Sequence, residues 1–126
     1  MITYDKAVLS ERITNLQRSL PDVEAAAVIS VDGLIMASAM PAEVSDDRIS
    51  AMSAAMLSLG QQINKEMGLG PLEQLLTRGS NGYVILLAIG TQAVLTTLVN
   101  SEAKLGMLFL ELRKAADEMA SLLDSR

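Results

Sequence analysis

The feature that most constrains this 126-residue chain is a stretch from Gly79 to Ser101 without a single charged residue. Two runs rich in Val, Ile, Leu and Thr, at 83–89 and 93–99, flank the interruption Gly90-Thr91-Gln92. A membrane-spanning helix needs about 20 apolar residues, so two strands joined by a tight turn are the better prediction. Both runs are apolar at nearly every position, and both faces of each strand should therefore be covered. We expect no membrane insertion and, because the N-terminus has no signal-peptide pattern, a cytoplasmic location.

The other segments supply further strands and helices, with turn and capping residues at their boundaries. Asp32-Gly33 and Asn81-Gly82 are typical of tight hairpin turns. Ser45 is a good helix N-cap, and Gly68 is suited to ending the same helix. No linker or repeat divides the chain, so we expect residues 1–126 to form one α+β domain. The expected helices cover 5–20, 45–67 and 101–123, and the expected strands cover 23–31, 34–40, 72–78, 83–89 and 93–99.

Composition excludes most kinds of chemistry. The chain contains no Cys and no His, which removes disulfides, the usual metal ligands and the common nucleophile–base pairs. A net charge of −5 and only 2% aromatic residues make it a poor partner for nucleic acid. It has neither a phosphate-binding P-loop motif nor a dinucleotide-binding GxGxxG motif. The sequence therefore predicts a protein that is not an enzyme, with no catalytic, cofactor-binding or metal-binding residues.

The second expected helix is unusual because no charge occurs between Ile49 and Gln61. One side carries an apolar stripe that we expect to pack on the sheet, formed by Ile49, Met52, Met56, Leu59, Ile63 and Met67. The opposite side carries small or uncharged residues, and a second copy of the same helix is the simplest way to cover it. The alternative is a solvated helix face built from Ala and Ser. The expected homodimer interface consists of Ala51, Ala54, Ala55, Ser58 and Gln62.

Two arginines are placed where they can reach a partner. Arg78 ends the strand expected at 72–78, which also carries Glu73 and is therefore expected at a sheet edge. Arg48 lies near the start of the second helix. An arginine finger is a function that a single residue can perform, but a lone exposed arginine is more often a solubilising charge. Both interpretations stay open at this point.

Four stretches combine these turns, apolar runs and helix composition in a characteristic order: VISVDGLIMAS, AMSAAMLSLGQQI, LEQLLTRGSNGYVILLAIGTQAVLTTLV and LGMLFLELRKAADEM. In this order they resemble the Roadblock and dynein light chain family, and more narrowly its MglB-like prokaryotic branch. The resemblance implies a profilin-like, Roadblock architecture. That fold is a five-stranded antiparallel sheet of order 2-1-5-4-3, with one helix on one face and two on the other. It also implies dimerisation through the second helix, often with pairing of third strands.

The same resemblance implies a function. Family members bind small Ras-like GTPases as activators or scaffolds, or serve as dynein light chains, and MglB-like members are thought to reshape the active site of the GTPase. We therefore expect a non-enzymatic homodimeric regulator of such a GTPase. The alternative is a passive assembly scaffold or light-chain-type adaptor that leaves nucleotide turnover unchanged. A small-molecule sensor is disfavoured by the scarcity of aromatic residues. The candidate GTPase contacts are Arg48, Gln61, Lys65 and Arg78.

Overall fold

The computed structural model describes residues 2–125 as one antiparallel five-stranded sheet, a short terminal sheet and three helices. The strand order of the main sheet is β3-β2-β6-β5-β4, and the two-residue strands β1 and β7 pair with each other. The helices are α1 (Lys6–Ser19), α2 (Asp46–Met67) and α3 (Leu105–Ala120). The strands are β1 (Ile2–Thr3), β2 (Val23–Ser30), β3 (Ile35–Ala39), β4 (Gln74–Gly79), β5 (Gly82–Ile89), β6 (Ala93–Asn100) and β7 (Asp124–Ser125).

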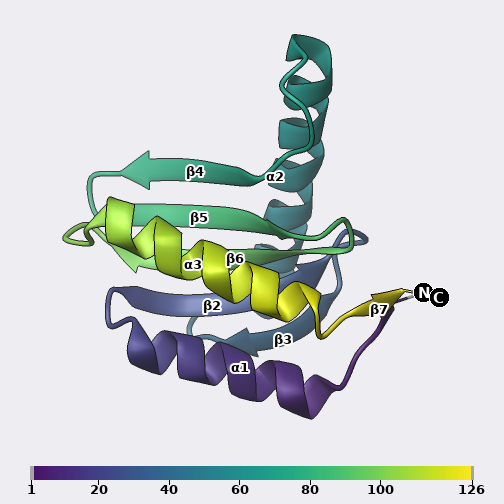
Figure 1. The fold of residues 1–126 in the computed structure, drawn as a ribbon. Helices are drawn as coiled ribbons and strands as arrows, with labels where there is room; N and C mark the ends of the chain where they lie inside the picture. Colours follow the sequence, from purple (N-terminus) through teal and green to yellow (C-terminus); the bar gives the residue numbers. More distant parts are fainter. Residues whose placement is uncertain (1, 126) are drawn as a thin grey trace.

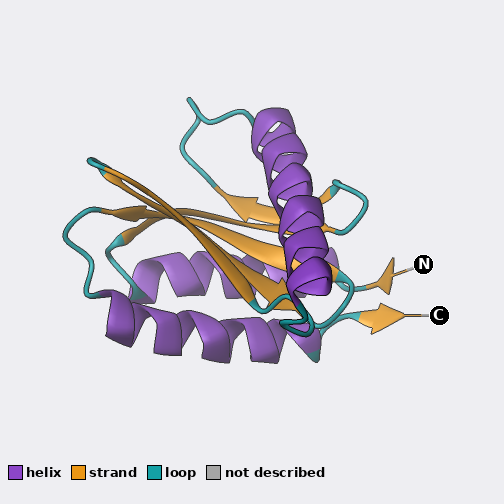
Figure 2. Cartoon of the chain, turned by 90° about the horizontal axis from the view of Figure 1, so that it is seen from above, coloured by secondary structure: helices purple, strands orange, loops and turns teal. Residues whose placement is uncertain are grey.

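The layers confirm the fold expected from the sequence. Counted over the main sheet alone, the strand order is 2-1-5-4-3. Helices α1 and α3 lie on one face of the sheet and run along the strands, whereas α2 lies on the other face and runs across them (Figures 1 and 2). The C-terminal end of α2 extends beyond the edge strand β4 in Figure 1.

Both faces of the central hairpin are covered, as its uncharged sequence requires. On the side of α1 and α3, Ile85 and Leu95 pack with Leu9 and Leu112 in the larger part of the core. On the α2 side, a smaller cluster joins Leu57 to central-strand residues. The members of that smaller cluster are Ala27, Ile29, Leu57, Leu86 and Val94.

The last helix is shorter than expected, because both of its ends are replaced by turns. Residues Ser101 and Glu102 form a turn in which the backbone N–H of Glu102 donates to Asn100 Oδ1 at 3.0 Å. At the other end, the N–H of Leu122 donates to the Met119 carbonyl, a tight bond that closes the helix. The helix expected at 101–123 therefore covers Leu105–Ala120, and strand β7 follows it.

Strand β4 is an edge strand, as predicted, because β5 is its only partner among the strands of residues 2–125. The register places Arg78 opposite Tyr83, and the guanidinium carbon lies 5.6 Å from the centre of the Tyr83 ring. This pair faces the same side of the sheet as α1 and α3, since Tyr83 belongs to the core on that side. Among the described residues, no helix is long and apolar enough to cross a membrane.

The glycines of the β4–β5 turn predict a matched pair of stability effects. A Cβ atom on Gly82 would lie 2.6 Å from the Val99 carbonyl oxygen, whereas one on Gly79 would find its nearest neighbour at 4.0 Å. We expect Gly82→Ala to lower the free energy of unfolding by about 1–3 kcal/mol because backbone must move. We expect Gly79→Ala to change it by less than about 0.5 kcal/mol. Urea denaturation followed by circular dichroism measures both, and equal effects would contradict the close approach.

Candidate functional site

Helix α2 has a capping residue at each end. Ser45 Oγ accepts a hydrogen bond from the backbone N–H of Arg48 at 3.4 Å. At the other end, Gly68 takes the left-handed conformation with φ at 67°, and the N–H of Leu69 donates to the Asn64 carbonyl at 2.8 Å. Both residues are the caps that the sequence predicted.

The side of α2 that meets the sheet is built from small residues, with one leucine. Ser50, Ser53, Leu57 and Gly60 are the buried positions of the helix. The Thr96 hydroxyl, on β6, donates to Ser53 Oγ at 2.9 Å in a buried position. A Cβ atom on Gly60 would lie 2.8 Å from Leu75 Cδ1, so the glycine allows the helix to approach β4 closely.

The expectation that the large apolar stripe of α2 packs on the sheet is wrong. Met52, Leu59 and Ile63 are 52, 60 and 47% exposed, and Met67 is also exposed. Only Ile49 and Met56 are half-buried. The physical reason is close packing: Ser53 and Gly60 bring the helix axis nearer to the sheet than the large side chains would allow. The helix therefore turns its largest side chains to its flank, and we call Met52, Met56, Leu59 and Ile63 the apolar flank.

The apolar flank borders a part of the sheet that α2 leaves uncovered. Ile49, on the same side of the helix, lines a small apolar pocket of about 60 Å³ together with Val84 and Leu98. Leu98 is exposed although it lies on the central strand β6. Exposed apolar surface that is continuous over a helix and a sheet is typical of a protein interface.

The residues expected at a homodimer interface lie mostly on the outer side of α2. Ala51, Ala55, Ser58 and Gln62 are exposed, and Ala54 is half-buried. Ala54 lies beside the β2–β3 turn, where its Cβ is 3.5 Å from the position of a Cβ on Gly33. Four of the five expected residues are thus accessible, and the fifth, Ala54, lies close to the β2–β3 turn of its own chain.

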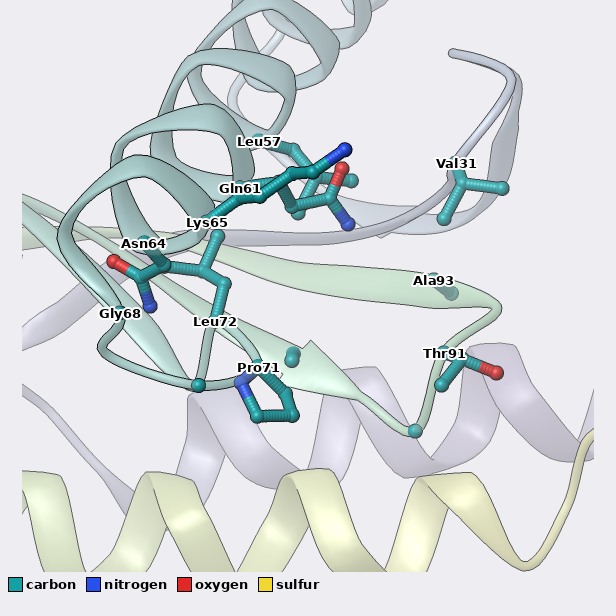
Figure 3. A pocket seen from close by; sticks show the side chains of 13 residues that line it. Val31, Leu57, Gln61, Asn64, Lys65, Gly68, Pro71, Leu72, Thr91 and Ala93 are labelled. Atoms are coloured by element: carbon teal, nitrogen blue, oxygen red, sulfur yellow. The ribbon is translucent and has the colours of Figure 1, made fainter.

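The candidate GTPase contacts fall into separate places. Gln61 and Lys65 line one pocket of about 510 Å³ between α2, the loop after it and the β5–β6 turn (Figure 3). Arg48 lies thirteen positions before Gln61, roughly 20 Å along the helix at 1.5 Å per residue. Arg78 lies on the opposite face of the sheet, over Tyr83. The structure therefore brings together two of the four residues.

Two further polar residues line this pocket and were not predicted. Asn64 lies one turn after Gln61, and Thr91 stands across the pocket in the β5–β6 turn (Figure 3). The spacing of three residues from Gln61 could have indicated Asn64, but nothing local places the β5–β6 turn near α2. Lys65 is the one charged residue among those that line the pocket.

Among the described residues, no group of His, Cys, Asp and Glu is suited to hold a metal ion. The arrangement is suited to binding a surface, and it assembles no acid–base pair.

Comparisons with known proteins agree with this fold. The model of the family described as Roadblock/LC7 domain matches residues 9–99. The uncharacterized protein MJ0310 of Methanocaldococcus jannaschii is 27% identical over 100 residues, which cover 79% of this chain and 87% of that protein. The structure of Myxococcus xanthus MglB matches with a TM-score of 0.84 at 16% identity, covering 90% of this chain and 93% of MglB. A structure described as MglB with tetrameric arrangement matches with a TM-score of 0.82 at 21% identity, covering 94% of this chain and 88% of that one.

The buried hydrogen bond between α2 and β6 predicts an effect on the free energy of unfolding. Ser53→Ala removes the acceptor of the buried Thr96 hydroxyl, so we expect it to lower the free energy of unfolding by about 1–3 kcal/mol. Ser58→Ala, on the exposed side of the same helix, should change it by less than about 0.5 kcal/mol. The double variant Ser53→Ala, Thr96→Val should recover most of the loss, because no unpaired group stays buried. Denaturant unfolding measures all three, and a Ser53→Ala variant as stable as Ser58→Ala would show that this bond does not hold the helix.

Proposed function

This chain belongs to the Roadblock/LC7 domain family, and from that premise we propose that it is a non-enzymatic, homodimeric regulator of a small Ras-like GTPase. The observation that carries the proposal is the apolar flank of α2 beside an uncovered part of the sheet. A solitary domain gains nothing from exposing Met52, Leu59 and Ile63 on one helix. The family supplies the class of partner, since the sequence resemblance implies GTPase regulation.

The proposed dimer places two α2 helices side by side and antiparallel across a two-fold axis. In this arrangement the second helix covers both the apolar flank and the uncovered sheet around Leu98. Met52, Leu59 and Ile63 are about half exposed, so burying each contributes on the order of 1 kcal/mol. The free edge of β4 is available for pairing with the β4 strand of the second copy under the same symmetry. The neighbour described as MglB with tetrameric arrangement supports self-association in proteins of this fold.

In this proposal the centre of the dimer contact is the apolar flank of α2, and no longer the small-residue side that the sequence predicted. Ala55 lies one turn before Leu59 and belongs to the contact, because small side chains allow the two helices to come close. Ala51, Ser58 and Gln62 lie at its outer border. Ala54 supports the β2–β3 turn of its own chain instead.

The GTPase is proposed to bind on the α2 side of the dimer, where Gln61 and Lys65 flank the large pocket. Lys65 is exposed and is suited to an acidic surface of the GTPase. Arg48 is also exposed and, on the outer side of α2, adds a second positive charge. Regulation is proposed to act by holding the GTPase in an active arrangement, with no catalytic side chain donated by this chain.

The dimer proposal predicts that one charge on the apolar flank separates the copies. Leu59→Glu should give monomers at micromolar concentration, because a dimer would bury an unpaired carboxylate. The side chain is exposed in the single copy, so the variant should keep its circular dichroism spectrum. Val8→Glu, at an exposed apolar position of α1, is the matched control and should stay dimeric. Light scattering coupled to gel filtration measures the mass, and a monomeric wild type would refute the proposal.

A further variant locates the contact on the helix. Ala51→Glu should weaken the dimer less than Leu59→Glu, because Ala51 is at the border of the proposed contact. The opposite order would return the centre of the interface to the small-residue side of α2. Both variants place the same charge on the same helix, so helix propensity alone does not explain a difference.

The regulatory proposal predicts how substitutions of the arginines and of Lys65 change GTP hydrolysis and binding. The test uses a Ras-like GTPase from the same organism, and this GTPase is first loaded with GTP. At saturating dimer, Arg48→Ala and Arg78→Ala should each keep the single-turnover hydrolysis rate within a few-fold of the wild type. Loss of a true arginine finger would cost about 10³–10⁵ in rate. Lys65→Glu should weaken binding and be rescued by more protein, whereas Lys6→Glu on exposed α1 should change nothing.

Two results would change this conclusion. A thousandfold loss of maximal rate in one arginine variant, with binding intact, would identify that residue as a catalytic finger. Binding of the GTPase without any change in hydrolysis or nucleotide exchange would favour the adaptor function.

A further inference from the structure

On the face of the sheet opposite α2, the end of α1 and the beginning of α3 enclose a second concave surface. It has a volume of about 280 Å³, and its apolar walls come from Leu20, Pro21, Met107 and Leu108. We call this concavity the α1–α3 notch. Its volume is near the lower limit of ligand pockets, about 300 Å³, which suits a side-chain anchor better than a cofactor.

The helix beside the notch carries two large apolar side chains that no described part of the chain covers. Met107 and Leu110 are 71 and 70% exposed, more than most of the apolar residues on α2. They are three positions apart on α3, so they are neighbours on the helix surface. Met107 also lines the notch, which makes the notch and this surface continuous. Methionine is a flexible side chain that adapts to different apolar partners.

The charges at the rim of the notch are unbalanced. Asp22, Glu102 and Glu111 line it, and Lys104 is the only cation among the lining residues. Asp22 is held in place because its Oδ1 accepts a hydrogen bond from Asn100 Nδ2 at 3.0 Å. Further along the α1–α3 seam the charges are paired, as Arg12 forms an ion pair with Glu118. Of the two concavities along this seam, the one lined by Arg12, Lys114, Glu111 and Glu118 is balanced, and the negative excess lies at the notch.

From this combination we infer that the α1–α3 notch is a docking site for a basic protein segment that carries an apolar anchor residue. The anchor enters the apolar concavity and packs on Met107, while flanking Lys or Arg side chains meet the three carboxylates. A second copy of this chain is a poor occupant, because a two-fold contact would bring two acidic rims together. An anionic membrane surface is repelled for the same reason. The site lies on the other face of the sheet from α2, so the inference does not depend on the proposed function.

Methionine methyl resonances provide a direct test with the full chain. The probe is a short synthetic peptide with one leucine between lysines, and the readout is the ¹³C-methyl NMR spectrum. We expect the peptide to shift the Met107 methyl resonance, while buried Met36 and Met119 and the α2 residue Met52 stay unchanged. The same peptide with glutamates for lysines, or with serine for leucine, should leave Met107 unchanged. Added salt should weaken the interaction, because the charges are exposed.

Variants separate the anchor from the charges. Met107→Ser should raise the Kd for the lysine peptide about tenfold, because the apolar contact is lost. Glu102→Lys should raise it about two- to fivefold, since one exposed charge pair is reversed. Glu11→Lys, an exposed reversal on α1 outside the notch, is the matched control and should leave the Kd unchanged.

Three results would overturn the inference. The first is a Met107 resonance that no lysine peptide moves up to about millimolar concentration, and the second is equal binding of the glutamate peptide. The third is a Met107 shift that depends on protein concentration without peptide, which would make the notch a contact between copies.

Discussion

The structure depends on the need to cover a hairpin that is apolar on both faces. Strands β5 and β6 occupy the middle of the sheet, and residues such as Ile85 and Leu95 on one face and Leu86 and Val94 on the other are removed from water. Two helices that run along the strands complete this task on one face. On the other face a single helix crosses the strands, so coverage stops before the sheet ends. The exposed Leu98 is the direct consequence.

The close packing of α2 on the sheet adds to the exposed apolar surface on this side. The small buried residues Ser50, Ser53 and Gly60 let the helix lie close to the sheet. The hydrogen bond from the Thr96 hydroxyl to Ser53 Oγ pairs the polar atoms that are buried there. The same packing turns Ser50, Ser53 and Gly60 toward the sheet and leaves Met52, Leu59 and Ile63 on the flank. The packing of this side of α2 on the sheet thus stabilises the single copy and, at the same time, leaves an apolar surface exposed.

The two faces of the sheet are consequently suited to different partners. The α2 side presents a helix surface without charge between Ile49 and Gln61 and an adjacent apolar flank, and these suit the symmetric contact proposed above. The α1–α3 side presents an apolar notch with an acidic rim, which disfavours self-contact and fits a basic partner. A sheet separates the two surfaces, so the two proposed contacts, one with a second copy and one with a different partner, do not exclude each other.

The sequence by itself determined the elements of the sheet, the main turns and both ends of α2, because these depend on local properties. Uncharged runs, the Asp32-Gly33 and Asn81-Gly82 turns, and the caps Ser45 and Gly68 act within a few residues. The family resemblance added the strand order. Only the tertiary structure decided which side of α2 meets the sheet, how the β5–β6 turn brings Thr91 to Gln61, and where Met107 and the acidic rim meet. The middle of α2 carries no charge, so no polar side marks the solvent there, and the orientation of the helix was set by how closely Ser53 and Gly60 pack on strands distant in sequence.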